Sequence, residues 1–312
     1  MNIIQYNNTH EDEWDLFILK SMNGTIYQTR KFINYHPIDR FIDKSIMVYD
    51  NNILICVIPV CKNGEKYFSH LGVTYGGPVI KEEYFKIDKL KEIIDLIFTH
   101  YENKLEMRIA NDIYFNNSQS SLIYLLQTKL NLNLELSWYI NNFNIDNINN
   151  KFNKRHLNKV KKDNNNIVYI TNDINDYNNF YKILKNTLNT KHNTNPTHTL
   201  EEFLLIKDIL QDKQKLCIVK NNNIIIAGIY FIEVTPNKYY SFYITKNYEC
   251  DKNFSSSCLL YIIDYFMKII KPNILDFGIT TENRGAELNM GLSVFKQDSM
   301  TGVSDYRYLF LL

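Results

Sequence analysis

Two segments in different halves of the chain share one pattern of apolar and polar positions. Residues 48–56 and 219–227 each hold apolar positions on either side of a polar turn, which is rich in Asn in both segments. A two-residue hairpin turn requires the left-handed backbone conformation, which Asn adopts with little strain. The pattern therefore predicts two β-hairpins of the same kind.

The elements that follow each hairpin also correspond. Each copy continues with a third strand, a helix and a further strand, at residues 66–69, 87–101 and 105–110 in the first half and 238–241, 255–270 and 274–278 in the second. Four elements in the same order indicate an internal duplication. Antiparallel strands followed by a crossing helix predict an α+β (mixed α/β) fold of two tandem domains, each a mixed, mostly antiparallel sheet flanked by helices.

Two helices are expected between the copies. Residues 146–163 are rich in Lys and Asn and place Phe152, His156 and Val160 at a spacing of four, which predicts a helix with a thin apolar stripe. Thr199 and Glu202 have the spacing of a capping box, which predicts a helix from there to Leu210.

The composition agrees with this fold and excludes some classes of function. The 312 residues, 45% of them hydrophobic, suffice for two packed cores. Lys+Arg 35 and Asp+Glu 34 nearly cancel, so the chain lacks the overall positive charge typical of nucleic-acid or membrane binding. We expect no nucleic-acid partner and no membrane span, because no apolar run approaches the ~20 residues that a bilayer requires.

Cysteine usage and the N-terminus favour a cytoplasmic protein. The five cysteines are scattered and form no CxxC pair, which is typical of reduced thiols. The first residues do not have the pattern of a signal peptide. The common nucleotide and zinc motifs, GxxxxGK[ST], GxGxxG and HExxH, do not occur.

A serine-rich helix start is one candidate ligand site. Residues 251–257 read Asp-Lys-Asn-Phe-Ser-Ser-Ser and lie between a strand and an apolar helix. Free backbone N–H groups and the helix dipole at such a start favour an anion, for example a pyrophosphate. Simple N-capping by Ser255 or Ser256 explains the same residues.

A basic segment is a second candidate. Six cations occur between residues 151 and 162, among them Lys154 and Arg155. They suit contact with the phosphates of a nucleotide or an RNA, and they equally suit a solvated helix face.

A glycine-rich loop is a third candidate. Residues 69–78 contain three glycines and a proline, which allow backbone to approach a ligand closely at Gly76 and Gly77. His70 and Tyr75 are its polar side chains. A structural turn with a capped histidine is the alternative.

Two polar loops of the second half carry groups that suit proton transfer. Residues 191–198 include His192 and His198, which titrate near neutrality and suit the removal of a proton from an attacking amine. Residues 275–289 begin as a strand and continue as a loop with Glu282 and Asn283. Loop histidines are otherwise simply exposed.

Taken together, these segments resemble the GNAT superfamily, and in particular proteins built like FemX, the nonribosomal peptidyltransferases with two GNAT-like domains. The closer likeness is to bacterial sugar N-acyltransferases of the FdhC type. The segments on which this resemblance rests are residues 23–25 with 35–36, 69–77, 154–157, 192–202 and 276–292.

The resemblance implies an acyl-CoA donor, acetyl-CoA or 3-hydroxybutanoyl-CoA, and no metal. It implies a C-terminal GNAT domain, residues 146–312, that binds CoA, and an N-terminal GNAT-like domain, residues 1–145, that forms an acceptor-side wall. The implied CoA-binding residues are Asn253, Phe254, Ser255, Ser256 and Ser257 at the helix start and Tyr243 and Ile244 on a splayed strand.

The implied acceptor is a nucleotide-linked (dTDP- or UDP-) amino deoxysugar for surface polysaccharide, such as O-antigen, capsule or lipopolysaccharide. Substrate-binding candidates are Gly76, Gly77, Lys154, Arg155, Thr280 and Asn283. An ammonium must lose a proton before it attacks a thioester, so a base is needed. His192 or His198 is the first candidate, followed by Glu282 and His70, and Tyr243 or Tyr75 is the candidate donor to the departing thiolate.

Two other functions remain open. An aminoacyl-tRNA-dependent transferase of the FemX kind would use the basic segment for RNA, against the near-neutral charge. A non-catalytic sugar-nucleotide-binding protein of the same fold would keep the site and lose the chemistry.

Overall fold

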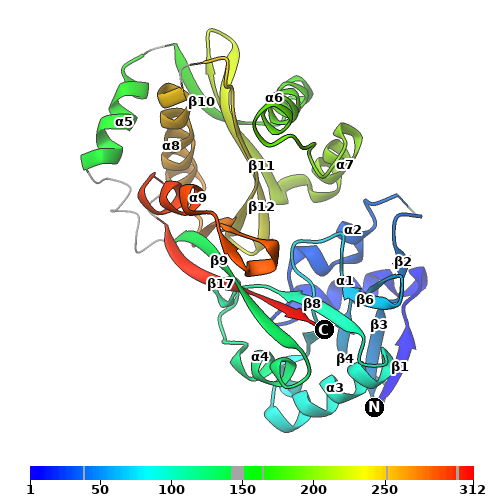
Figure 1. Cartoon of the computed structure of the whole chain (residues 1–312). Coiled ribbons are helices and arrows are strands. Elements are labelled where there is room, and N and C mark those ends of the chain that lie inside the picture. The colour runs from blue at the N-terminus through cyan, green and yellow to red at the C-terminus, as the bar shows by residue number, and fades with distance from the viewer. Residues whose placement is uncertain (38, 142–150, 164, 251, 300–301) are drawn as a thin grey trace. The chain divides into compact units, whose positions relative to one another are not determined.

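The computed structural model describes residues 1–37, 39–141, 151–163, 165–250, 252–299 and 302–312 (Figure 1). The chain divides into two compact units. Unit 1 comprises Met1–Leu136, Thr281–Leu288 and Asp305–Leu312, and unit 2 comprises Ser137–Thr280 and Asn289–Ser304. The predicted domain boundary between residues 145 and 146 lies outside the described residues and stays a prediction.

Unit 1 contains two groups of paired strands. The first has the order β1-β3-β4-β7 and is antiparallel, with β1 Asn2–Gln5, β3 Ile46–Asp50, β4 Ile53–Ile58 and β7 Val79–Ile80. The second has the order β17-β8-β6-β5-β2, with β17 Val303–Leu311, β8 Leu105–Ile109, β6 Lys66–Ser69, β5 Cys61–Asn63 and β2 Ile42–Asp43. In it β6 runs parallel to β8, and β17 runs antiparallel to β8.

The core of unit 1 lies between these strands and the helix α3. This helix, Ile87–His100, buries Leu90, Ile93, Ile94, Ile97 and Phe98, which recur at the spacing of one helical face. They pack with residues of β3, β4 and β8 in one cluster. The other helices of unit 1 are α1 Glu11–Lys20, α2 Arg30–Ile33 and α4 Ser120–Gln127.

Unit 2 has one sheet with the order β10-β11-β12-β13-β14-β9. Its strands are β10 Asn166–Thr171, β11 Gln214–Asn221, β12 Ile224–Thr235, β13 Lys238–Lys246, β14 Ile274–Ile279 and the part of β9 (Asn131–Asn141) that begins at residue 137. All neighbours are antiparallel except β13 and β14, which are parallel.

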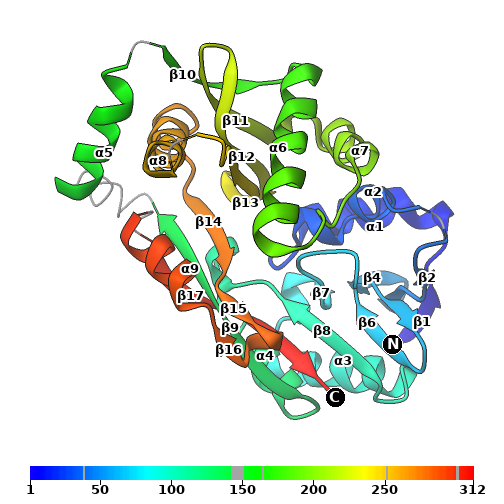
Figure 2. The ribbon, with the colours of Figure 1, turned by 45° about the horizontal axis from the view of Figure 1, so that its top comes forward.

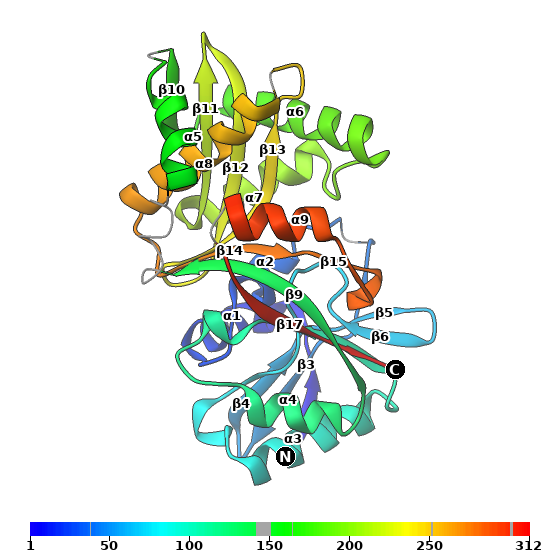
Figure 3. The ribbon, with the colours of Figure 1, turned by 60° about the vertical axis from the view of Figure 1, so that its left-hand side comes forward.

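Helices cover both faces of this sheet (Figure 2). Alternate residues of β12 point to opposite faces. Ile229 and Phe231 pack with α8 (Lys252–Ile269), and Gly228 and Tyr230 face α6 (Ile174–His192). The remaining helices are α5 Lys151–Lys161, which packs along α8 (Figure 3), α7 Leu200–Leu210, and α9 Met290–Val294, which continues as the π-helical turn η8 Phe295–Ser299.

Both predicted hairpins are present, and their turns have the same backbone. Asn51 and Asn52 have φ values of 48° and 64°, and Asn222 and Asn223 have 47° and 66°. The capping box of Thr199 and Glu202 also forms and opens α7. The third strand of each copy pairs differently. In unit 2 the third strand, β13, pairs with β12 of the hairpin. In unit 1 the third strand, β6, pairs with β5 and β8, and β4 of the hairpin pairs with β7.

The predicted fold class is confirmed: the chain is mixed α/β with mostly antiparallel sheets. Within the described ranges, no helix has the length and hydropathy to cross a membrane. The same residues contain no cluster of His, Cys, Asp or Glu side chains that would hold a metal ion. All five cysteines are free thiols; four are buried, and Cys250 is half-buried.

Candidate functional site

An opening between two parallel strands is the main feature of unit 2. β13 and β14 pair only from Lys238 to Tyr240, opposite Ile274 to Asp276. Beyond this point β13 continues to Lys246 while its described ladder is formed with β12 alone. Among the described residues, β13 and β14 form no ladder from Phe242 to Thr245, and the ligand-binding role predicted for this stretch stays a prediction.

The end of β14 is bent and fixed by three residues. Asp276 is fully buried, and its Oδ1 accepts the Ser137 hydroxyl at 3.0 Å and the Gly278 N–H at 2.6 Å. Gly278 has a φ of 74°, and a Cβ there would lie 2.7 Å from the Tyr240 hydroxyl, so only glycine fits. These contacts fix the backbone at the end of β14.

Lys296 completes this arrangement. Its Nζ donates to the carbonyl oxygens of Phe277, Gly278 and Ile279 at 2.6, 3.0 and 2.9 Å. The lysine is 5% exposed, and η8 carries it. The ammonium thus donates to three successive carbonyls of the bent strand end and carries a positive charge there. No local sequence motif marks this residue.

Tyr243 of β13 forms a pair with His198, which lies in the loop before α7. His198 Nδ1 lies 2.6 Å from the Tyr243 hydroxyl, and the His198 ring stacks at a tilt on Phe242. Burial raises the pKa of Tyr243 well above its usual value. The phenol is therefore protonated at neutral pH and suits donation to a developing negative charge. The Tyr181 hydroxyl bonds to the His198 carbonyl at 2.8 Å and holds the loop in place.

The predicted serine-rich site lies at the first turns of α8. The helix begins at Lys252 rather than at residue 255, so the alternative of N-capping by Ser255 or Ser256 is wrong. Ser255 and Ser257 are buried, and Lys246 Nζ donates a hydrogen bond to Ser256 Oγ at 2.6 Å. Residue 251 and the side chain of Asn253 lie outside the described part of the chain.

Positive charge gathers at this helix start. Lys246 and Lys191 both lie over the ring of Tyr248, at 5.2 and 4.9 Å from its centroid. The first N–H groups of an α-helix have no partner within the helix, and the dipole adds partial positive charge. The lysines, the free N–H groups and the helix dipole therefore favour an anion here, independently of the serines.

The basic segment forms α5, which packs on α8. Leu157 and Val160 are buried, and His156 Nδ1 lies 3.0 Å from the Ser257 hydroxyl. Lys154 and Arg155 are exposed. Lys161 pairs with the buried Asp264 at 2.8 Å, so one of the six cations has a structural role.

Of the two loop histidines, only His198 has a described side chain. His192 is the last residue of α6, and Asn193 ends the helix in the left-handed conformation. The prediction that His192 is a base therefore stays a prediction. Thr280 is buried, and its hydroxyl accepts the indole N–H of Trp138 at 3.0 Å.

The glycine-rich loop belongs to unit 1, and its polar groups are paired internally. Gly76 N–H donates to the Arg108 carbonyl at 2.8 Å, and Gly77 N–H donates to Ser69 Oγ at 2.7 Å. The hydroxyl of the buried Tyr75 lies 3.4 Å from Asn111 Oδ1. These contacts give the loop a rigid structural role in this unit.

His70 is buried in this loop. Its Nδ1 accepts the Gly72 N–H at 3.1 Å, and its ring packs edge-on against Phe41. Burial lowers the pKa of His70 to about 4. The ring is neutral at physiological pH, with one nitrogen already engaged.

This burial makes stability depend on pH in a defined direction. Between pH ~6.5 and ~4 the unfolded chain binds a proton on His70 that the folded chain excludes. The unfolding free energy should therefore fall as pH drops through this window, by up to about 3 kcal/mol. Urea unfolding of the wild type and His70→Asn measures it: the variant should show a weaker pH dependence, and identical slopes would contradict the assignment.

Glu282 and Asn283 lie in a short hairpin that belongs to unit 1. Glu282 is exposed on β15 (Thr281–Glu282), which pairs with β16 (Glu287–Leu288). Between them Asn283, Arg284 and Gly285 have φ values of 48°, 57° and 88°. Gly285 is required, because a Cβ there would lie 2.6 Å from the Leu134 carbonyl oxygen. Three successive residues in the left-handed region make a sharp turn that projects Arg284.

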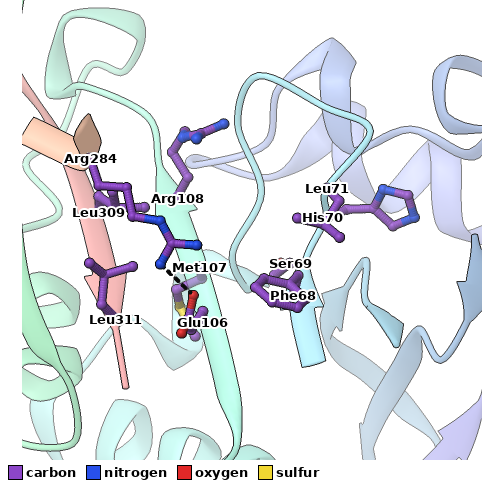
Figure 4. A pocket seen from close by; sticks show the side chains of 10 residues that line it. All are labelled: Phe68, Ser69, His70, Leu71, Glu106, Met107, Arg108, Arg284, Leu309 and Leu311. Carbon is purple, nitrogen blue, oxygen red and sulfur yellow. Dashed lines mark hydrogen bonds and ion pairs between the residues drawn. The ribbon is translucent and has the colours of Figure 1, made fainter. Parts of the chain in front are cut away.

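Arg284 lines a pocket of about 110 Å³ in unit 1 (Figure 4). Its guanidinium points toward Glu106, and the His70 ring points away from both (Figure 4). The lining residues come from β6, β8, β17 and the hairpin: Phe68, Ser69, His70, Leu71, Glu106, Met107, Arg108, Arg284, Leu309 and Leu311. Only His70 among them was a predicted site residue, and Glu106, Arg108, Arg284, Leu309 and Leu311 join it from segments distant in sequence.

Comparison with known proteins establishes the fold. No family model matches the chain, and no curated protein matches it. Among solved structures, FemX aligns over 100% of this chain and 98% of its own, with a TM-score of 0.68 and 14% identity. L-PGS from Bacillus licheniformis covers 86% of this chain and 83% of its own, with a TM-score of 0.59 and 12% identity.

A tandem GNAT protein from the clavulanic acid biosynthesis pathway covers 99% of this chain and 97% of its own, with a TM-score of 0.54 and 5% identity. The chain therefore has a FemX-like, tandem GNAT-type fold, as its resemblance implied. The closer likeness to FdhC-type sugar N-acyltransferases stays a prediction.

Proposed function

We propose that the chain is an acyltransferase that moves an acyl group from a coenzyme A thioester to the amino group of a nucleotide-linked amino deoxysugar. The observation that carries the proposal is the opening between β13 and β14, beside the start of α8 and the lysines at that start. It brings together an extended strand with free backbone groups and a positively charged helix start within unit 2.

The helix start suits the pyrophosphate of the donor. Backbone N–H groups and the dipole of α8 favour negative charge, and Lys246 adds a full positive charge 2.6 Å from Ser256. The pantetheine arm then lies along β13, where the backbone from Phe242 to Thr245 is available to it. Tyr243 and Ile244 keep the roles that the sequence predicts.

Acyl transfer follows from the groups at the opening. The neutral amine attacks the thioester carbon, and backbone N–H groups of β13 stabilise the oxyanion. When the C–S bond breaks, the Tyr243 hydroxyl gives its proton to the sulfur. The attacking nitrogen loses a proton to His198. The 2.6 Å hydrogen bond between His198 and Tyr243 then allows the histidine to reprotonate the tyrosine. The products are an amide and free CoA thiol.

The acceptor class rests on the sequence resemblance, which points to dTDP- or UDP-linked amino sugars used for surface polysaccharide. A cytoplasmic location fits such substrates. The shape of the pocket determines which acyl group, which sugar and which amine position react, and the assay described below identifies them.

The basic face of α5 supports a second candidate donor, an aminoacyl-tRNA. Lys154, Arg155, Lys159 and Lys162 are exposed, and α5 itself contains no acidic residue. An RNA bound to this face would show steep salt dependence, because each phosphate contact releases a counterion.

The first experiment measures free thiol release from acetyl-CoA and 3-hydroxybutanoyl-CoA with a panel of dTDP- and UDP-linked amino sugars. We expect release that depends on one amino sugar. Lys246→Ala should weaken CoA binding about tenfold by calorimetry, because it removes one charge-assisted contact. Lys268→Ala removes a lysine near the other end of α8 and should leave CoA binding unchanged.

Two results would overturn the proposal. No CoA binding together with no thiol release would exclude the thioester donor, and salt-sensitive tRNA binding would then favour the second candidate. CoA binding that is equal in wild type and Lys246→Ala would place CoA elsewhere.

A further inference from the structure

The pocket of unit 1 lies on a sheet face that carries an excess of positive charge. Glu106 pairs with Lys66 at 2.8 Å and with Arg284 at 3.4 Å. Glu135 pairs with Arg307 at 2.7 Å and with Arg108 at 3.7 Å. Two buried carboxylates thus share four cations, and Arg284 and Arg108 are the two that line the pocket.

Each carboxylate is neutralised by a close partner that does not line the pocket. Lys66 approaches Glu106 more closely than Arg284 does, and Arg307 donates to Glu135 through both Nε and an Nη. Arg284 contacts Glu106 at 3.4 Å through one nitrogen, and its side chain is 61% exposed. A planar guanidinium held in this way presents further N–H donors to a ligand.

The chain fixes Arg284 in place from the backbone. Asn133 Nδ2 donates to the Arg284 carbonyl at 2.9 Å, and Gly285 packs directly on the Leu134 carbonyl. The left-handed φ of 57° at Arg284 is unfavourable for a side chain of this size. The hairpin therefore holds a strained turn whose one long side chain extends toward the pocket (Figure 4).

Apolar side chains make up much of the remaining lining, together with Ser69 and His70. Phe68, Leu309 and Leu311 lie beside the charged groups. The volume of about 110 Å³ indicates a small pocket. It suits one anionic group with a short apolar body.

We propose that this pocket binds an oxyanion, the carboxylate or phosphate group of a small, partly apolar molecule, between Arg284 and Arg108. Both oxyanions match the fork of donors on a guanidinium, and the apolar body contacts Leu309 and Leu311. The proposal goes beyond the transfer reaction and does not depend on it, because no thioester is needed for binding.

The test is a titration followed by NMR of ¹³C-labelled leucine methyl groups in the whole chain. Inorganic phosphate, acetate and isobutyrate are added in turn at constant ionic strength set with chloride. We expect saturable shifts at Leu309 and Leu311 with phosphate or with the carboxylates, and tighter binding of isobutyrate than of acetate. Which arm responds identifies the group.

Charge variants decide whether the arginines are responsible. Arg284→Gln should weaken binding at least about tenfold, and Arg284→Lys should weaken it less, since it keeps the charge and loses the fork. Arg108→Gln serves as an independent second variant. Lys91→Gln removes an exposed cation of α3 that pairs with Asp95, and it should bind as the wild type does.

The proposal fails if the shifts do not saturate or if chloride alone reproduces them. It also fails if Arg284→Gln and Arg108→Gln fold and bind the anions as tightly as Lys91→Gln does. Equal binding of acetate and isobutyrate would overturn the apolar part of the assignment. None of these results depends on whether CoA binds to unit 2.

Discussion

Lys296→Met should lower the free energy of unfolding by about 3 kcal/mol. The substitution removes a buried ammonium and leaves the carbonyls of Phe277, Gly278 and Ile279 without that donor. A charge-assisted hydrogen bond contributes about 1.5–3 kcal/mol, and burying the lysine charge costs part of that sum. The bonds dominate because methionine fills the space but donates nothing to the three carbonyl oxygens.

Urea unfolding measures this effect, with the loss of thiol release as the functional readout. Lys268→Met is the matched control: its lysine is 56% exposed and pairs with Asp264 one helical turn away. Because this lysine is mostly exposed and the buried Asp264 keeps Lys161 as a second partner at 2.8 Å, we expect Lys268→Met to cost less than about 1 kcal/mol. If the two variants unfold at the same urea concentration, Lys296 does not support the end of β14.

The contrast between Lys296 and the hairpins shows what the sequence could and could not predict. Asn51, Asn52, Asn222 and Asn223 determine their turns locally, so the hairpins and the duplication were predictable. The capping box at Thr199 is equally local. The α+β class followed from the order of these elements.

Pairing partners were less accessible to prediction. Nothing in the hairpin of unit 1 indicates that β4 pairs with β7 while β6 pairs with β5 and β8, because partner choice depends on tertiary packing. The start of α8 was placed three residues late for a related reason: serine suits an N-cap and a first helical turn alike.

The candidate site divides in the same way. Tyr243, His198 and the serines of α8 occur in segments whose local pattern indicated a strand, a polar loop and a helix start. The pocket of unit 1 could not be predicted in this way, because Glu106 and Arg284 are 178 positions apart and no local pattern indicates that they meet. Asp276 and Gly278 were noted as a strand end, but their role with Lys296 required the structure.

Tyr243→Phe should reduce kcat about 100-fold and change the KM for acyl-CoA little. The hydroxyl is the proton donor of the proposed reaction, and general acid catalysis contributes about 10²–10⁴ in rate. Phenylalanine keeps the ring packing against Phe242 and Phe203. Tyr230→Phe is the control, since the described residues offer its buried hydroxyl no hydrogen-bond partner, and kcat should stay unchanged.

A change of leaving group separates proton donation from mere positioning of His198. A thiolate that is a weaker base needs less help from an acid, so an aryl thioester donor should restore most of the rate lost in Tyr243→Phe. If the hydroxyl only positions His198, the variant should be equally slow with alkyl and aryl thioesters. Equal defects with both donors would therefore remove Tyr243 from the chemical step while leaving the thioester donor itself intact, because wild-type turnover is measured in the same assay.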